Sequence, residues 1–345
     1  MIRYNNDYNH GAHPEILKVL VEDNDNAYGG YGKDEWCEKA SAIIKDVVGD
    51  ENANIHFMVA GTQTNFIVLS AMLRHPFNSV ISVDSGHIVV HESGAVENTG
   101  HKVETVPGVE GKLNAAQVED MMENCNNSPT YEHITHPKAV YISYPTEFGT
   151  IYSLKELEDL RKVCDKYGLY LYIDGARLGY GLAASNCDLT IKDIHRLSDA
   201  YYIGGTKCGN FMGEAVVIKS EELNEDFRNY MKMNGALLAK GWLIGLQYAV
   251  QFRNGLYFDI TEAAVRKADK IQEAFEEAGF ELFIKGTTNQ LFYVLPKKVM
   301  DKLAKDFIFE FNHWVDENHG LVRFCTSWAT TEEEADALIK AVRSL

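Results

Sequence analysis

Short apolar runs alternate with amphipathic helical patterns along the chain as far as Ile218, and this alternation limits the fold more than any other feature of the sequence. Seven apolar runs are expected to form strands, at Ile55–Val59, Val80–Val83, Val103–Val106, Ala139–Ser143, Leu169–Ile173, Ala200–Ile203 and Ala215–Ile218. Helices are expected before and between them, at Pro14–Val21, Asp34–Val48, Thr62–Leu73, Asn114–Glu123 and Leu154–Tyr167. Because strands that alternate with helices form βαβ units, the pattern predicts an α/β protein with a mainly parallel seven-stranded sheet.

The pattern changes after Glu221, where long helical segments replace the alternation. One continuous helix is expected over Leu223–Asn254, and an amphipathic helix over Thr261–Gly279 is expected to lead out of the first domain. A small α+β domain is expected next, with strands at Leu282–Ile284, Gln290–Val294 and Leu321–Phe324 and helices at Lys297–Lys305 and Thr331–Leu345. We therefore expect an N-terminal arm at residues 1–14, a large domain at 15–250 and a small C-terminal domain at 251–345.

The composition argues against several classes of protein. The chain has 33 Lys and Arg against 50 Asp and Glu, a formal net charge of −17, whereas nucleic-acid binding needs a concentrated basic surface. No basic start followed by an apolar segment is present, and Lys240 and Gln247 interrupt the most apolar long stretch. The six cysteines lie far apart, with no CxxC pair. We expect a cytoplasmic protein with reduced thiols and with neither a nucleic-acid nor a membrane partner.

The residues that follow the expected strands are the candidates for a site, because ligands of open α/β sheets bind beyond the carboxyl ends of the strands. The first such loop, Ala60–Asn65, joins a strand to a helix. Gly61 lets the backbone approach a ligand closely, and the helix start at Thr62 offers amide donors to a phosphate. An ordinary helix N-cap is the alternative interpretation.

Two further strand ends carry ionisable side chains. His87 and His91 follow one strand and can stack on a planar ligand or shuttle protons, or they are ordinary loop histidines. Asp174 ends another strand, with Arg177 three residues later. These two either form a structural ion pair, or the acid holds a proton on a ligand ring nitrogen and the arginine binds a substrate carboxylate.

The fourth strand end contains Lys207, which glycines and small residues surround in the segment Gly204–Asn210. Its amine is either solvated in a flexible turn or a nucleophile that forms a Schiff base. The spacing between Asp174 and Lys207 allows one more crossover, which would bring acid and lysine to the same edge of the sheet.

The order of these groups resembles that of pyridoxal phosphate enzymes of the aspartate aminotransferase fold. DGARL at Asp174–Leu178, GGTKCGNFMGEAVVI at Gly204–Ile218 and VAGTQTN at Val59–Asn65 are similar to the threonine aldolase and β-eliminating lyase family, and the resemblance runs nearly end to end. It implies the PLP-dependent transferase fold of type I and pyridoxal 5'-phosphate as cofactor. It also implies a lyase that cleaves L-threonine and L-allo-threonine to glycine and acetaldehyde.

Carried over position by position, the resemblance implies a role for each matching residue. Lys207 would form the Schiff base, Asp174 would hold the pyridine nitrogen, and His87 would stack on the ring. The other residues implied at the cofactor are Gly61, Thr62, Arg177, Thr206 and Lys240, the last reaching the phosphate of a neighbouring subunit. The residues implied at the amino acid substrate are Asn6, Tyr31, Arg177 and Arg323.

The chain departs from the family at one point, since Thr146-Glu147 stands where the better-known branch has a Thr-His pair. The base that accepts the substrate hydroxyl proton is therefore open among His87, His91, Glu147 and a water that they hold. Another β-hydroxy amino acid aldolase, such as one for phenylserine, and a β-eliminating lyase stay as alternatives, as does a non-catalytic PLP-binding sensor. The resemblance also implies a homo-oligomer, a dimer or a homotetramer, with active sites at the subunit interface, and we expect no catalytic zinc.

Overall fold

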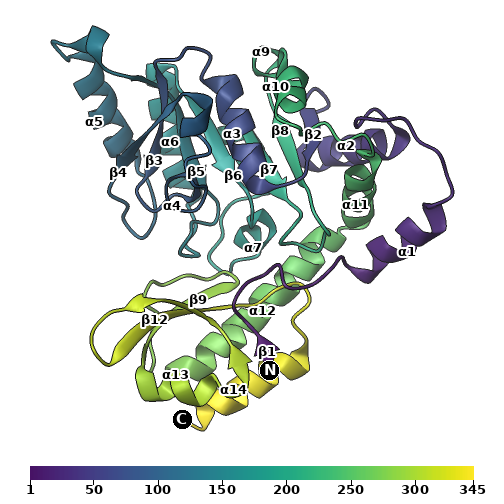
Figure 1. Ribbon diagram of the computed structural model, residues 1–345. Helices are drawn as coiled ribbons and strands as arrows, with labels where there is room; N and C mark the ends of the chain where they lie inside the picture. The colour runs from purple at the N-terminus through teal and green to yellow at the C-terminus, as the bar shows by residue number, and fades with distance from the viewer.

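A seven-stranded sheet organises the larger part of the computed structural model, which describes residues 1–345 (Figure 1). Its spatial order is β2-β8-β7-β6-β5-β3-β4. The strands are β2 (Asn54–Met58), β3 (Asn78–Val83), β4 (Lys102–Val106), β5 (His136–Ser143), β6 (Tyr170–Asp174), β7 (Ala200–Gly204) and β8 (Glu214–Ile218). The neighbours from β7 to β4 are parallel, whereas β8 is antiparallel to both β7 and β2. The predicted mainly parallel sheet of seven strands is confirmed, and each strand overlaps the run expected for it.

Helices cover both faces of this sheet (Figure 1). One face packs against α2 (Glu35–Val48), α5 (Ala115–Asn126), α6 (Leu154–Tyr167), α8 (Ile191–Leu197) and α11 (Trp242–Phe252). The other packs against α3 (Gly61–Met72) and α10 (Phe227–Met233). Because successive side chains of a strand point to opposite faces, Ile173 and Ile203 join the first core while Tyr172 and Tyr202 join the second. Burial on both faces explains why the strands read as continuous apolar runs.

The helices expected in the first half of the chain are confirmed, including α1 (Pro14–Asp23), and short α4 (His87–Val90) and α7 (Leu178–Leu182) add to them. Side-chain caps fix several starts. Asn114 and Ser153 each accept a hydrogen bond from the third residue of the following helix, whose side chain binds back to the cap. None of the helices combines the length and the apolar character that crossing a membrane requires.

The continuous helix predicted over Leu223–Asn254 is wrong. Three separate helices occupy this segment, α9 (Glu221–Asn224), α10 and α11. Asp226, between α9 and α10, has φ 59°, and Gly235, after α10, has φ 71°. A right-handed helix cannot pass through residues in the left-handed region, so the segment turns at both places.

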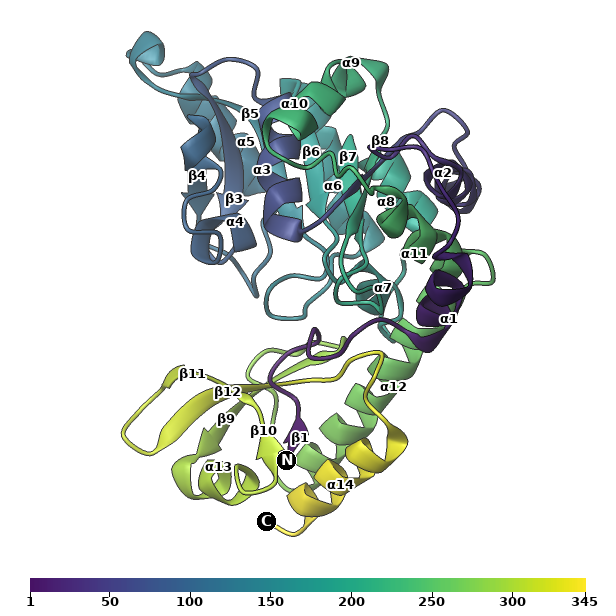
Figure 2. The same cartoon turned by 45° about the vertical axis from the view of Figure 1, so that its right-hand side comes forward.

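The remaining elements form a smaller part, shown at the bottom of Figures 1 and 2. It contains a three-stranded antiparallel sheet in the order β11-β12-β9. Its elements are α12 (Leu256–Glu277), β9 (Gln290–Pro296), α13 (Lys297–Leu303), β10 (Phe307–Ile308), β11 (Glu310–Trp314), β12 (His319–Cys325) and α14 (Glu332–Arg343). The strand predicted at Leu282–Ile284 is wrong, because only an isolated bridge joins Leu282 to Tyr293. β11 was not predicted, since all five of its residues are exposed and give no alternating pattern.

The first residues of the chain pack on this smaller part. β1 (Ile2–Arg3) pairs in parallel with β10, and Tyr4 is fully buried in the core formed by α12, β9, β12 and α14. The beginning of the predicted arm is therefore built into the C-terminal core. The division of the chain at residues 14 and 250 stays a prediction.

Tyr4→Ala should lower the free energy of unfolding by about 3–5 kcal/mol, because it leaves a cavity in a closed core. Tyr4→Phe is the matched control, since the Tyr4 hydroxyl has no hydrogen-bond partner and its loss should change little. Urea denaturation measures both. A Tyr4→Ala protein as stable as Tyr4→Phe would contradict the placement of residues 1–4 in that core.

Candidate active site

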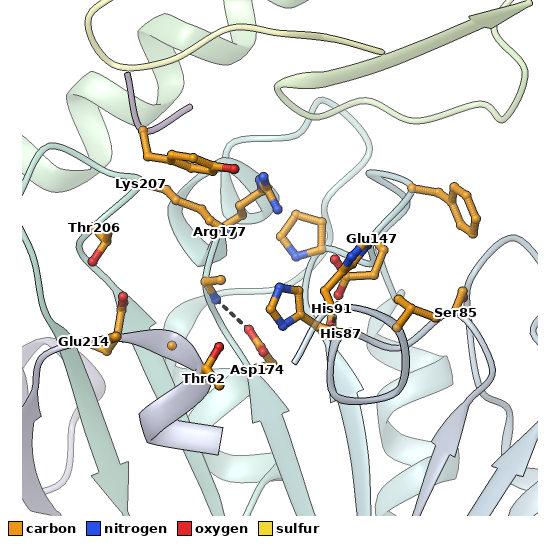
Figure 3. A pocket seen from close by; sticks show the side chains of 18 of the residues that line it. Thr62, Ser85, His87, His91, Glu147, Asp174, Arg177, Thr206, Lys207 and Glu214 are labelled. Atoms are coloured by element: carbon orange, nitrogen blue, oxygen red, sulfur yellow. Dashed lines mark hydrogen bonds between the residues drawn. The ribbon is translucent and has the colours of Figure 1, made fainter. Parts of the chain in front are cut away.

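A cavity of about 890 Å³ lies at the carboxyl ends of β5, β6 and β7, between the sheet and the smaller part (Figure 3). Phe292, Phe311 and Arg323 line it from the smaller part. Ten of the residues singled out in the sequence line this cavity: Gly61, Thr62, His87, His91, Glu147, Asp174, Arg177, Thr206, Lys207 and Arg323. Strand ends far apart in the sequence therefore meet in one place, as expected for a parallel sheet.

Asp174 lies at the bottom of the cavity and is 4% exposed. Its carboxylate accepts hydrogen bonds from the hydroxyls of Tyr141 (2.6 Å) and Tyr202 (2.5 Å) and from the side-chain amide of Asn65 (2.9 Å). Burial raises the pKa of Asp174, but the charge of His87 and these hydrogen bonds hold that pKa below its usual value. The acid is therefore ionised and can keep a proton on a cationic ligand atom.

His87 is oriented by a second buried acid, Glu92, whose Oε1 accepts from His87 Nδ1 at 2.7 Å. Asn65 donates to the same oxygen at 2.7 Å and so links Glu92 to Asp174. Burial lowers the pKa of His87, but the hydrogen bond that His87 donates to Glu92 and the charges of Glu147 and Asp174 outweigh burial and raise that pKa. The ring is thus held in one orientation and favours the protonated form.

Lys207 lies in the loop after β7, and its amine forms no hydrogen bond or ion pair within the chain. The loop closes on itself, since the Gly205 N–H donates to the Gly213 carbonyl at 3.1 Å. A Cβ on Gly205 would come within 2.2 Å of Asn210 Nδ2, so this close turn requires glycine. The loop presents an unpartnered primary amine to the cavity, where it can reach a ligand carbonyl group.

The start of α3 offers an anion cradle, formed by the backbone N–H groups of Gly61, Thr62 and Gln63. None of the three donates to an acceptor in the chain, and the N-cap residue Ala60 supplies no side-chain acceptor. A Cβ on Gly61 would lie 3.2 Å from the Tyr202 hydroxyl, a tight contact that glycine avoids. Free amides and the positive end of a helix dipole are suited to a phosphate.

The groups around the cavity fit pyridoxal phosphate, the cofactor that the resemblance implies. The amine of Lys207 suits its aldehyde, and ionised Asp174 suits a protonated ring nitrogen. The anion cradle and the hydroxyl-bearing residues Thr62 and Thr206 suit its phosphate.

Arg177 forms a buried pair with Asp7 rather than with Asp174. Its Nε and Nη2 donate to the two Asp7 oxygens at 2.7 and 3.1 Å, and Asn289 donates to Asp7 at 3.0 Å. The structural Asp174–Arg177 pair considered from the sequence is therefore absent. Nη1 of Arg177 has no hydrogen-bond partner, and the residue lines the cavity, so this nitrogen can bind an incoming anion.

Arg323 reaches the cavity from β12 and is already occupied by partners within the chain. Nη1 donates to Gln290 Oε1 at 3.0 Å, and Nη2 donates to the Asn5 carbonyl at 3.1 Å and to Glu310 of β11. A carboxylate that binds Arg323 must compete with Glu310, which lies on the exposed edge strand.

Three residues expected at the site do not line this cavity. Asn6 is half-buried and its Oδ1 accepts from the Tyr8 N–H at 3.0 Å, while Tyr8 itself reaches the cavity. Tyr31 and Lys240 lie close together elsewhere, since the Tyr31 N–H donates to the Ala239 carbonyl. Their assigned roles stay predictions.

The sequence did not single out the residues that support the site, notably Asp7, Asn65, Glu92, Tyr141 and Tyr202. The available signal was one tyrosine in each of three neighbouring strands, Tyr141 of β5, Tyr172 of β6 and Tyr202 of β7, which lie on the same face of the sheet.

Glu147 faces the cavity beside His91 (Figure 3) and accepts a hydrogen bond from the Ser143 hydroxyl at 2.7 Å. Ser143 is the last residue of β5. The carboxylate is thus fixed by the strand that leads to it.

Comparisons with known proteins show which family the chain resembles along its length. A model of the beta-eliminating lyase family matches residues 18–297. The low-specificity L-threonine aldolase of Pseudomonas aeruginosa is 27% identical over 336 residues, which cover 96% of this chain and 94% of that protein. The low-specificity L-threonine aldolase of Pseudomonas sp. is 25% identical, covering 97% and 95%. The solved structure of Leishmania major threonine aldolase is 40% identical, covers 100% of this chain and 99% of that one, and superposes with a TM-score of 0.97.

Asp7→Asn should lower the free energy of unfolding by about 3–5 kcal/mol, because Arg177 would stay buried without its counter-charge. Urea denaturation at neutral pH measures the loss, with the exposed Asp301→Asn as the matched control. A loss no larger than that of the control would contradict the buried pair.

The same variant tests the pH dependence. Burial raises the pKa of Asp7, but the charges of Arg177 and Lys207 and the hydrogen bonds from Arg177 and Asn289 together outweigh burial and lower that pKa to about 2, below its usual value of 3.8. The stabilisation is therefore complete above the unfolded pKa and is lost as the pH falls toward 2. The stability difference between wild type and Asp7→Asn should narrow between about pH 5 and pH 2. A difference that stays constant over this range would show that Asp7 keeps an ordinary pKa.

Proposed function

The chain belongs to the beta-eliminating lyase family, and on that premise we propose that it is a pyridoxal 5'-phosphate-dependent threonine aldolase. It cleaves L-threonine and L-allo-threonine to glycine and acetaldehyde. The observation that carries the proposal is that one cavity brings together ionised Asp174, the unpartnered amine of Lys207 and the anion cradle of α3. The full-length likeness to threonine aldolases supports this reaction over others of the same fold.

The residues of the cavity hold the cofactor at three places. When bound, pyridoxal phosphate withdraws electrons from the α-carbon of an attached amino acid. Lys207 would hold the cofactor through its aldehyde, and Asp174 would keep the proton on the ring nitrogen. His87, fixed by Glu92, would contact the ring. The anion cradle with Thr62 and Thr206 would bind the phosphate.

Two arginines orient the amino acid through its carboxylate. Arg177 can bind the carboxylate through Nη1, because its other two nitrogens donate to Asp7. Arg323 can bind the carboxylate after its ion pair with Glu310 has broken. Holding the carboxylate from two sides would fix the rotation about the bond between the α-carbon and its nitrogen. The two arginines would thereby decide which bond of the α-carbon is oriented for cleavage.

Glu147 is the base that accepts the proton of the substrate β-hydroxyl. His87 is less suited, because its Nδ1 is bound to Glu92 and its raised pKa favours the protonated form. Glu147 is fixed by Ser143 and faces the cavity. His91 lies beside it and can stabilise its charge.

The protein acts as a homo-oligomer with its sites at subunit interfaces. Lys240 is exposed and lies outside the cavity of its own chain, and Tyr31 is 47% exposed beside the same segment. These positions support a role for both residues at the cavity of a neighbouring subunit, Lys240 at its phosphate.

The first test is the near-ultraviolet and visible absorbance of the purified protein, with and without added cofactor, for wild type and Lys207→Ala. Acetaldehyde released from L-threonine and L-allo-threonine is measured in parallel. A visible band that is lost in Lys207→Ala, together with acetaldehyde release, is the expected result.

Other outcomes separate the alternatives. Aldehyde released from phenylserine but not from threonine indicates a different β-hydroxy amino acid aldolase. Keto acid formation from substrates with a leaving group at the β-carbon indicates a β-eliminating lyase. A band without any turnover indicates a sensor, and no band at all contradicts the use of the cofactor.

Glu147→Gln should lower kcat for L-threonine cleavage by about 10²- to 10⁴-fold, because the amide cannot accept the hydroxyl proton. Ser143→Ala is the matched control and should lower kcat less, since it removes only one hydrogen bond to that carboxylate. Steady-state kinetics with both variants measures the difference. Unchanged kcat in Glu147→Gln would move the base to His87 or His91.

Glu310→Gln should lower KM for L-threonine by about two- to fivefold, because Arg323 would no longer have to break its ion pair with Glu310 before it binds the substrate carboxylate. kcat should stay near the wild-type value. Glu262→Gln, which removes an exposed ion pair with Arg266 on α12, is the matched control and should leave KM unchanged. A raised KM in Glu310→Gln would show that Glu310 assists binding instead of competing with it.

A further inference from the structure

Glu214 is a buried acid of the cavity to which the proposed mechanism gives no role. It is the first residue of β8, opposite Met58 of β2 and Gly204 of β7. The residue is 4% exposed and lines the cavity. The Gly205 N–H donates to its Oε2 at 3.0 Å, which leaves Oε1 as the oxygen that can carry a proton. No ion pair of the chain includes this carboxyl.

The titratable groups that face Glu214 come from several elements. They are Lys207 and Cys208 in the loop after β7, Tyr202 on β7, Tyr172 and Asp174 on β6, and Tyr248 on α11. Burial raises the pKa of Glu214 to about 8, which outweighs the opposing effects of Thr206, the Gly205 N–H and the Lys207 charge, while the Asp174 charge adds to the rise. At neutral pH the carboxyl therefore carries a proton.

Glu214 lies at the same corner of the cavity as the proposed phosphate site. In Figure 3, Glu214 is next to Thr206 and across from Thr62 at the start of α3. β8 places it there, because its backbone partner Met58 is three residues before Gly61. A phosphate monoester is close to a dianion at neutral pH, and an ionised carboxylate at this corner would repel it. A protonated carboxyl would instead form a charge-assisted hydrogen bond with a phosphate oxygen.

We propose that Glu214 is a neutral carboxylic acid that donates a hydrogen bond to the phosphate group of the bound cofactor. The inference rests on the proposed function, in particular on binding of the phosphate at the start of α3. Glu214 thereby replaces a cation as a ligand of the phosphate within this chain.

The proposal has a defined pH dependence. The negative phosphate raises the pKa of Glu214 above its value in the cofactor-free protein, so the bound form holds the proton more tightly than the free form. By linkage, cofactor binding weakens as the pH rises above about 8, by at most about tenfold for each pH unit. Below that pH, Glu214 contributes no pH dependence.

Phosphorus-31 NMR of the cofactor-loaded protein tests the inference directly. In wild type, the chemical shift of the bound phosphate should change in one step above pH 8. Glu214→Gln should abolish this step, because its amide donates a hydrogen bond and accepts from the Gly205 N–H at every pH. Glu147→Gln is the matched control, since it neutralises another acid of the same cavity and should keep the step.

Equilibrium dialysis of pyridoxal phosphate gives a second readout. Between about pH 8 and pH 10, the affinity of wild type should fall at least about tenfold more than that of Glu214→Gln. A bound phosphate without a step in wild type, or a step that persists in Glu214→Gln, would overturn the inference. A protein that binds no cofactor at all would overturn the proposed function instead, so the two failures can be told apart.

Discussion

The cavity depends on keeping one buried carboxylate, Asp174, ionised. Moving such a group out of water costs several kcal/mol unless hydrogen bonds compensate for its lost hydration. Tyr141 and Tyr202 supply two of these hydrogen bonds and Asn65 supplies another, so β5, β7 and α3 all converge on the end of β6. Lys207 follows β7, the parallel neighbour of β6. The pairing of β6 with β7 thus brings the segments that carry the acid and the amine to the same edge of the sheet.

The smaller part meets the sheet through buried polar contacts as well as apolar ones. Asp7, from the N-terminal segment, accepts hydrogen bonds both from Arg177, which follows β6, and from Asn289, which precedes β9. Arg323 of β12 is bound to the Asn5 carbonyl in the same N-terminal segment. Both arginines that face the cavity are therefore positioned by residues near the beginning of the chain. A substrate carboxylate held between them would bridge the two parts.

Much of the fold was predictable, because buried parallel strands are continuous apolar runs and their ends mark the site; Asp174 and Lys207 were found in this way. The break in the predicted long helix was not, since Gly235 is compatible with a helix and only its left-handed conformation ends one. Asp7 was missed because its partner Arg177 is 170 positions away. No local pattern marks such a pair. In the sequence, Tyr202 has the pattern of an ordinary buried aromatic residue of a strand. Only the fold shows that its hydroxyl donates a hydrogen bond to the Asp174 carboxylate.

The pairing of β1 with β10 has a consequence for how the chain folds. Ile2 lies beside Phe307, so the two strands come from opposite ends of the sequence. Contacts of such high sequence separation form late, because a long loop must close before they are gained. The seven-stranded sheet is complete at Ile218 and its pairings span shorter separations. During synthesis the N-terminal strand must wait until nearly the whole chain has left the ribosome, and the arginines acquire their final positions only at that stage.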